Sequence, residues 1–138
     1  MLTDELREKL IQAAVEARHW AYAPYSRYRV GAAVLTGSGK IYDGVNVENA
    51  AYPDSICAER VAVFKAVSEG EKNFEALVVS TNNGGTPCGS CRQVLAEFGL
   101  DTLVVIVDDQ GRVLHEQRLS ELLPNSFGQA DLQGNNQE

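Results

Sequence analysis

The sequence has only three cysteines, two histidines and one tryptophan among its 138 residues. An odd number of cysteines excludes a complete set of intramolecular disulfides, on which many small secreted domains depend. Basic residues are also few, since 12 Lys and Arg stand against 19 Asp and Glu and give a formal net charge of −7. Nucleic-acid binding relies on clustered positive charge, and the sequence has no such cluster, so we expect no polymeric DNA or RNA partner.

The sequence also lacks long apolar runs. None approaches the roughly 20 residues that a helix needs to cross a bilayer. Residues 1–25 alternate charged and apolar side chains and contain no signal-peptide core. We therefore expect no membrane partner and a cytoplasmic location, where thiols stay reduced. In that compartment a C-x-x-C pair is more typical of a metal or redox site than of a structural disulfide.

The composition fits one globular domain, with 44% hydrophobic and 22% charged residues. Apolar periodicity and turn residues predict helices near residues 3–20, 56–70, 88–99 and 120–123, and strands near 29–35, 40–47, 75–81, 102–109 and 112–119. This alternation predicts an α/β fold, a three-layer α/β/α sandwich with a mixed sheet of about five strands. Residues 1–127 would form the single domain, and the polar residues 128–138 a flexible C-terminal tail.

All three cysteines lie in two short motifs. Cys57 belongs to "CAER", and Cys88 and Cys91 belong to "PCGSCRQ". Each motif is predicted at the first turn of a helix, where free N–H groups and the helix dipole favour thiolates. The C-x-x-C spacing lets two sulfurs from one turn reach a common zinc ion at about 2.3 Å. Cys57 is then the one cysteine left to act as a third ligand.

Four interpretations of the cysteines are open: packing residues, a thioredoxin-like redox pair, a structural zinc site and a catalytic zinc site. A redox pair leaves "CAER" without a role. A structural zinc needs a fourth ligand, and the candidates, His19 and His115, are expected to be surface or packing residues. A catalytic zinc keeps its fourth position for water and needs a nearby carboxylate that is not a ligand. Glu59, two residues after Cys57, could move protons there.

Three thiolates would give the zinc site a formal charge of about −1 and make the ion a weaker Lewis acid than zinc held by neutral histidines. The helix N-termini offset part of this charge. Arg60 and Arg92 are each adjacent to a cysteine in the sequence, and we expect them to tune the thiolate charge by hydrogen-bonding the sulfurs. The alternative for both is an ordinary surface salt bridge.

Together, "CAER" and "PCGSCRQ" resemble the signature of the zinc cytidine deaminases. The resemblance extends to "YSRYRVGAAV", to "NVENAAYPDSICAERVAVFKAVSEG" and to "LLPNSFG", in the family's order. The chain is similar to the small cytidine deaminases that use three cysteines and form homotetramers. The resemblance implies one Zn²⁺ per chain held by Cys57, Cys88 and Cys91, with Glu59 as the catalytic proton carrier.

The resemblance also implies substrate-binding residues. Asn46 and Glu48 of "NVEN" would hold a ribose hydroxyl, and Tyr28 stands where the family usually has a phenylalanine that packs on the pyrimidine. Ala58, between Cys57 and Glu59, is also expected to bind substrate. Phe127 would reach the active site of a neighbouring subunit, or would simply pack in the core.

Residues 1–127 would then be a single catalytic domain of the cytidine deaminase type. The implied reaction is hydrolytic deamination of cytidine and 2′-deoxycytidine to the uridine nucleosides and ammonia, in pyrimidine salvage, with active sites at the interfaces of a homotetramer. One alternative is a deaminase of a cytosine-containing antibiotic such as blasticidin S. The alternative from another class is a non-catalytic zinc-stabilised or thiol redox protein.

Overall fold

Five strands form one mixed sheet, as predicted. The structure is a computed structural model, which describes residues 1–135. Its strands are β1 (Gly31–Thr36), β2 (Ile41–Val45), β3 (Phe74–Ser80), β4 (Leu103–Val107) and β5 (Val113–Arg118). They lie in the order β2-β1-β3-β4-β5; β3 and β4 are parallel, and the other neighbouring pairs are antiparallel. The parallel pair requires a crossover between its strands, and a helix supplies it.

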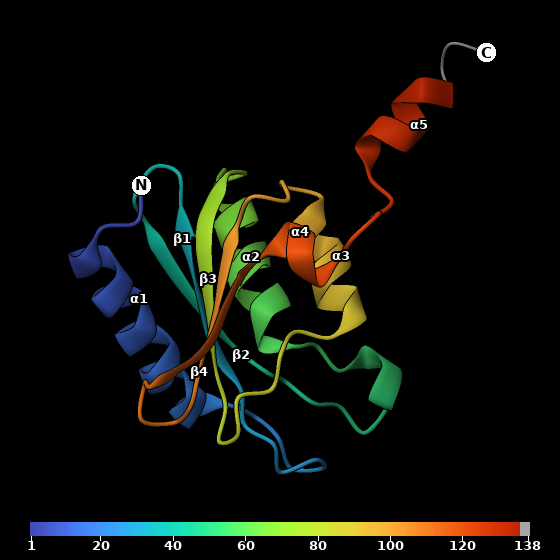
Figure 1. Cartoon of the computed structure of the whole chain (residues 1–138). Coiled ribbons are helices and arrows are strands. Elements are labelled where there is room, and N and C mark those ends of the chain that lie inside the picture. Colours follow the sequence, from blue (N-terminus) through green and yellow to red (C-terminus); the bar gives the residue numbers. More distant parts are fainter. Residues whose placement is uncertain (136–138) are drawn as a thin grey trace.

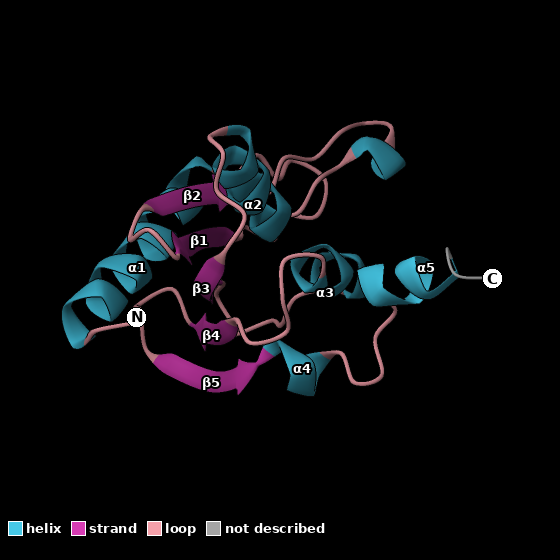
Figure 2. Ribbon diagram, turned by 90° about the horizontal axis from the view of Figure 1, so that it is seen from above, coloured by secondary structure: helices cyan, strands magenta, loops and turns pink. Residues whose placement is uncertain are grey.

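Helices cover both faces of the sheet (Figures 1 and 2), which confirms the predicted three-layer sandwich. The helices of the sandwich are α1 (Asp4–Ala17), α2 (Ala58–Ser68), α3 (Gly89–Ala96) and α4 (Leu119–Leu122). α1 packs on one face, with Leu10 in the core there, and the other three pack on the opposite face, with Val63 in the core there. Because both faces are covered, all six residues of β1 are buried. In the described part of the chain, no helix is long and apolar enough to cross a membrane.

A glycine in β2 lets α2 approach the sheet closely. A Cβ atom at Gly44 would lie 2.5 Å from the carbonyl oxygen of Ala58 and 2.5 Å from the amide nitrogen of Ala62, which is far inside van der Waals contact. The first turns of α2 therefore rest directly on the sheet backbone. This contact sets the position of the residues at the start of α2, Cys57 and Glu59 among them.

The C-terminal segment contains a helix that the sequence analysis did not predict. Gln129–Asn135 forms a further helix, α5, which extends away from the sandwich (Figure 1). The start of this helix is held by local polar contacts: Gly128 N–H donates to Asp131 Oδ2 at 2.8 Å, and Gln129 Nε2 donates to Glu97 Oε2 at 2.6 Å. The flexibility predicted for this segment stays a prediction, and residues 136–138 of the predicted tail lie outside the described residues.

Candidate active site

The three cysteines come together where α2 and α3 begin. Cys57 is the N-cap residue of α2, Cys88 is the N-cap residue of α3, and Cys91 lies in the first turn of α3. The Sγ atoms of Cys57 and Cys88 are 3.9 Å apart, those of Cys88 and Cys91 are 3.4 Å apart, and all three lie within 4.8 Å of one another. Sulfurs bound at about 2.3 Å to one tetrahedral zinc ion would be about 3.8 Å apart. The donor set therefore fits zinc.

Neither histidine joins this group. In the described part of the chain the metal-ligating cluster contains the three cysteines alone, and both His19 and His115 are exposed elsewhere on the surface. A tetrahedral zinc ion held by three protein ligands keeps one position open. The arrangement thus matches a catalytic zinc site better than a structural one.

The sulfurs at this site lie in a field that stabilises negative charge on Cys57. Its pKa is lowered to about 5, first by a hydrogen bond from the Cys91 thiol and then by the nearby Arg60 guanidinium. Arg60 Nη2 donates to Cys57 Sγ at 3.4 Å. In the same pair the pKa of Cys91 is raised, because its thiol donates to the Cys57 thiolate and is buried. Within this pair the negative charge therefore lies on Cys57 before metal binding, and zinc must displace the proton of Cys91.

Arg92 differs from the prediction. Its Nε donates to the Pro87 carbonyl oxygen at 2.8 Å, its Nη1 to the Leu122 carbonyl oxygen at 2.7 Å, and its Nη2 to Thr86 Oγ1 at 3.1 Å. Each guanidinium nitrogen thus has an oxygen acceptor, and the expected hydrogen bond from Arg92 to a sulfur is not formed among the described residues. The physical reason is that Arg92 points back along α3, where it ties the segment before Cys88 to the end of α4.

Glu59 lies in the first turn of α2, two residues after Cys57. Its side chain is buried, with the residue only 5% exposed. Burial disfavours the carboxylate and raises the pKa of Glu59 to about 7, and the neighbouring Cys57 thiolate adds to this effect. A carboxyl group with a pKa near 7 can both accept and donate a proton at neutral pH. Glu59 therefore has the properties of a general acid–base group beside the metal site.

A cavity of about 310 Å³ opens in front of the cysteines and Glu59. This volume lies near the lower end of the range for small-molecule sites. The cavity is lined by Ser26, Tyr28, Val30, Asn46, Glu48, Ser55, Ile56, Cys57, Glu59, Thr86 and Cys88. The predicted residue Ala58 is fully buried and is not part of this lining. The lining combines segments that are far apart in the sequence, so the fold assembles the cavity.

The two predicted sugar-binding residues lie on the cavity wall and are held by the backbone around Tyr28. Asn46 Oδ1 accepts the Val30 N–H at 3.0 Å, and Asn46 Nδ2 donates to the Tyr28 carbonyl oxygen at 2.8 Å. Glu48 Oε1 accepts the N–H groups of Tyr25 and Ser26, each at 3.0 Å. These bonds leave each side chain with hydrogen-bonding capacity for a ligand.

Ser26 was missed in the sequence analysis. Its hydroxyl donates to Glu48 Oε2 and accepts the Tyr28 N–H at 3.0 Å. The hydroxyl bond to Glu48 is the first cause of the lowered pKa of that carboxyl group. Ser26 lies within the "YSRY" segment, which belongs to the resemblance and could have drawn attention to it. Serine is common in turns, however, so its presence there does not by itself indicate a bond to Glu48.

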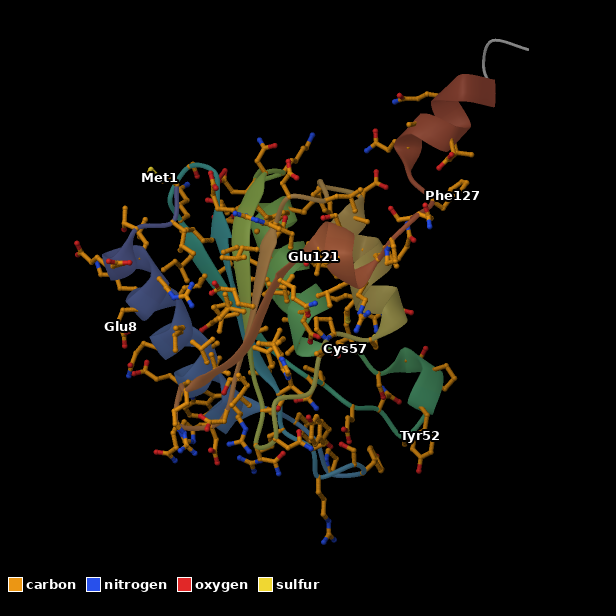
Figure 3. The ribbon with its side chains drawn as sticks, viewed as in Figure 1. Met1, Glu8, Tyr52, Cys57, Glu121 and Phe127 are labelled. Atoms are coloured by element: carbon orange, nitrogen blue, oxygen red, sulfur yellow. The ribbon has the colours of Figure 1, made fainter. Side chains whose placement is uncertain are left out.

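Tyr28 and Phe127 have different positions relative to the cavity. Tyr28 lines it, and the Tyr28 hydroxyl donates to Asn83 Oδ1 at 2.6 Å. Phe127 is 57% exposed and lies on the segment that leads away from the sandwich, apart from Cys57 (Figure 3). The alternative that Phe127 packs in the core is therefore excluded, and within one chain it does not reach the site.

Comparison with known proteins agrees with this geometry. Residues 4–107 match the model of the family described as the cytidine and deoxycytidylate deaminase zinc-binding region. The chain is 46% identical over 127 residues to a cytidine deaminase of Sporosarcina psychrophila, which covers 91% of this chain and 93% of the relative. It is also 46% identical over 129 residues to a cytidine deaminase of Halalkalibacterium halodurans, covering 91% of this chain and 97% of the relative.

Solved structures show the same likeness. The crystal structure of cytidine deaminase from Burkholderia pseudomallei superposes with a TM-score of 0.83 at 43% identity, and the match covers 91% of this chain and 100% of that one. The crystal structure of cytidine deaminase from Mycobacterium tuberculosis gives a TM-score of 0.79 at 37% identity, covering 92% of this chain and 99% of that one. The chain therefore belongs to the cytidine and deoxycytidylate deaminase family, with Cys57, Cys88 and Cys91 as its zinc site.

Proposed function

We propose that this protein catalyses the hydrolytic deamination of cytidine and 2′-deoxycytidine to uridine and 2′-deoxyuridine, with release of ammonia, in pyrimidine salvage. The observation that carries the proposal is the position of Glu59. It is a buried carboxyl group with a pKa near 7, beside three zinc-type cysteines and at the wall of a cavity of nucleoside scale. A purely structural zinc site would have no use for such a group.

The residues of the chain have separate roles in this reaction. Zinc, when bound by the three thiolates, acts as a Lewis acid and lowers the pKa of water. Glu59 accepts one proton from the water as its oxygen bonds to C4 of the pyrimidine, and passes that proton to N3. Glu59 then moves the second proton of the water to the amino group, which leaves as ammonia while the C4 carbonyl forms. One water is consumed and one ammonia is released for each nucleoside. Both protons of the water are accounted for, and Glu59 ends as the carboxylate with which it began.

The surroundings of the cysteines support this chemistry. Cys57 and Cys88 are the N-cap residues of α2 and α3, so the positive ends of two helix dipoles lie near the sulfurs and offset part of the thiolate charge. Arg60 adds a full positive charge at Cys57. We infer that Arg60 tunes the thiolate charge, whereas Arg92 acts through the backbone of the segment before Cys88.

The polar wall of the cavity fits the sugar of a nucleoside. Glu48 can accept a hydrogen bond from a sugar hydroxyl, and Asn46 has one N–H left to donate. Ribose and 2′-deoxyribose both carry a 3′-hydroxyl. Hydrogen bonds to that side of the sugar therefore allow both nucleosides to bind. No Lys or Arg occurs among the described residues of the cavity lining, which favours a free nucleoside over a nucleotide.

We further propose that the chain assembles as a homotetramer in the cytoplasm, with Phe127 of one subunit near the cavity of another. Large apolar side chains are exposed on the described surface, with Trp20 83%, Tyr52 70% and Phe127 57% exposed. Tyr52 begins a short 3-10 helix, Tyr52–Asp54, which lies apart from the sheet in Figure 3. Burial of such side chains between subunits would be favourable.

An ultraviolet absorbance assay tests the substrate. Cytidine, 2′-deoxycytidine, CMP, cytosine and blasticidin S are offered to the purified protein under identical conditions. The two nucleosides should be deaminated with the highest kcat/KM. Preference for blasticidin S would favour the antibiotic-deaminase alternative, and preference for CMP or cytosine would contradict the sugar-binding role of Asn46 and Glu48.

A further inference from the structure

The hydroxyl of Tyr28 forms a hydrogen bond with a residue outside the cavity lining. Tyr28 lines the cavity, but its hydroxyl donates to Asn83 Oδ1 at 2.6 Å, and Asn83 is not among the described lining residues. Asn83 lies in the β3–α3 loop (residues 81–88), which leads from the sheet to Cys88. A side chain of the base-binding wall is thus bonded to the segment that carries a zinc ligand.

The β3–α3 loop is shaped to receive this hydroxyl. Thr81 is 2% exposed, and its Oγ1 accepts the N–H groups of Gly84 at 2.8 Å and Gly85 at 3.0 Å, which fixes the turn around Asn83. A Cβ atom at Gly85 would lie 2.4 Å from the Tyr28 hydroxyl oxygen. The absence of a side chain at residue 85 therefore leaves the space that the hydroxyl occupies.

The backbone of Tyr28 is hydrogen-bonded to two other residues of the cavity lining. Its N–H donates to Ser26 Oγ at 3.0 Å, and Ser26 in turn donates to Glu48. Its carbonyl oxygen accepts Asn46 Nδ2 at 2.8 Å. Tyr28 is therefore held at its backbone by Asn46 directly and by Glu48 through Ser26, and at the far end of its ring by Asn83.

We propose that Asn83 is a positioning residue, which fixes the Tyr28 ring against the pyrimidine of the bound nucleoside. The proposal rests on the proposed function, together with the expected packing of this ring on the base. A phenylalanine at residue 28 would present the same face but would be held at its backbone only. The tyrosine hydroxyl gives this chain a second point of attachment, so the ring is held in place before substrate binds.

The expected effect of losing the bond lies in KM. The ring contacts the base in the ground state and in the transition state alike, so a less well-placed ring weakens both states and raises KM while kcat changes little. The net contribution of a typical hydrogen bond corresponds to a change in KM of about three- to tenfold. Cytidine and 2′-deoxycytidine should be affected equally, because they share the base.

Four variants test the proposal by steady-state kinetics: Tyr28→Phe, Asn83→Ala, the double variant and Asn83→Asp. Each of the first two should raise KM about three- to tenfold, and the double variant should raise it no further, because both changes remove the same bond. Asn83→Asp keeps an oxygen acceptor and should restore KM to near the wild-type value. The matched control is Asn82→Ala; Asn82 is exposed, makes no side-chain hydrogen bond to a described residue, and should leave both constants unchanged.

Zinc content and thermal unfolding are measured for every variant, so that a folding defect is recognised separately. The proposal is overturned if Asn83→Ala has the same KM as Asn82→Ala, if the two single effects add in the double variant, or if Asn83→Asp fails to restore KM. It is also overturned if Asn83→Ala raises KM only because zinc is lost. A wild-type protein that deaminates no cytosine nucleoside would instead refute the proposed function.

Discussion

Replacing Glu59 by glutamine should make the metal-free protein more stable at alkaline pH. Glu59 is buried, and its pKa is raised from 4.5 to about 7. Between these two values the folded state binds more protons than the unfolded state, so the free energy of unfolding falls as pH rises from about 4.5 to about 7. Above that window the full penalty of burying the carboxylate remains. Glutamine is neutral at every pH and carries no such penalty.

The size of the effect follows from the two pKa values. A separation of about 2.5 pH units, from 4.5 to about 7, corresponds to about 3 kcal/mol at about 1.4 kcal/mol per unit. Glu59→Gln should therefore increase the free energy of unfolding by about 3 kcal/mol at pH 8 but by only about 1 kcal/mol at pH 5.

Urea denaturation followed by circular dichroism measures this difference. The wild type and the variant are compared at pH 5 and pH 8, at one protein concentration, with a strong chelator and a thiol reductant present. Because both proteins keep their cysteines, titration of the thiols contributes to both curves. Glu69→Gln, an exposed change at the end of the same helix, is the control and should not alter the pH dependence. A Glu59→Gln protein no more stable than wild type at pH 8 would refute the reasoning.

Three further changes test other parts of the site. Ser26→Ala removes the hydroxyl bond to Glu48 and should raise KM for cytidine about tenfold with little change in kcat; an unchanged KM would contradict the positioning of Glu48. Arg92→Ala removes three hydrogen bonds around the start of α3 and should lower the free energy of unfolding by about 2–4 kcal/mol in urea denaturation and speed zinc release to a chromogenic chelator; wild-type zinc release would contradict its tie to the segment before Cys88. Gly44→Ala should push α2 off the sheet and cost about 1–3 kcal/mol in the same denaturation assay, and a wild-type midpoint would show that the contact with Ala58 is not tight.

The architecture could be predicted because the responsible signals are local. The β-branched run of β4 and the apolar run of β3 indicate strands, and the alternation with helices indicates layers. Cys88 and Cys91 could be paired from their spacing on one helical turn. Cys57 could be added because no other cysteine remained, even though it lies 31 residues from Cys88 in the sequence.

The finer contacts could not be predicted because they join segments brought together only by the fold. The guanidinium of Arg92 is close in sequence to the sulfurs, yet its direction along α3 takes it to Leu122 instead. The partner of the Tyr28 hydroxyl, Asn83, lies 55 residues away. The helix α5 was missed because the polar residues 128–138 have little apolar surface to indicate an ordered element.

The most direct test of the central claim is a measurement of zinc content and cytidine turnover on the wild type and on Glu59→Gln, with Glu69→Gln as the control. The wild type should hold about one tightly bound zinc per chain and convert cytidine to uridine. Glu59→Gln should keep the zinc and lose at least about 100-fold in kcat, because glutamine cannot carry protons. Turnover like the wild type in that variant would contradict the role of Glu59. A metal-free wild type with a reducible Cys88–Cys91 disulfide would contradict the zinc site itself.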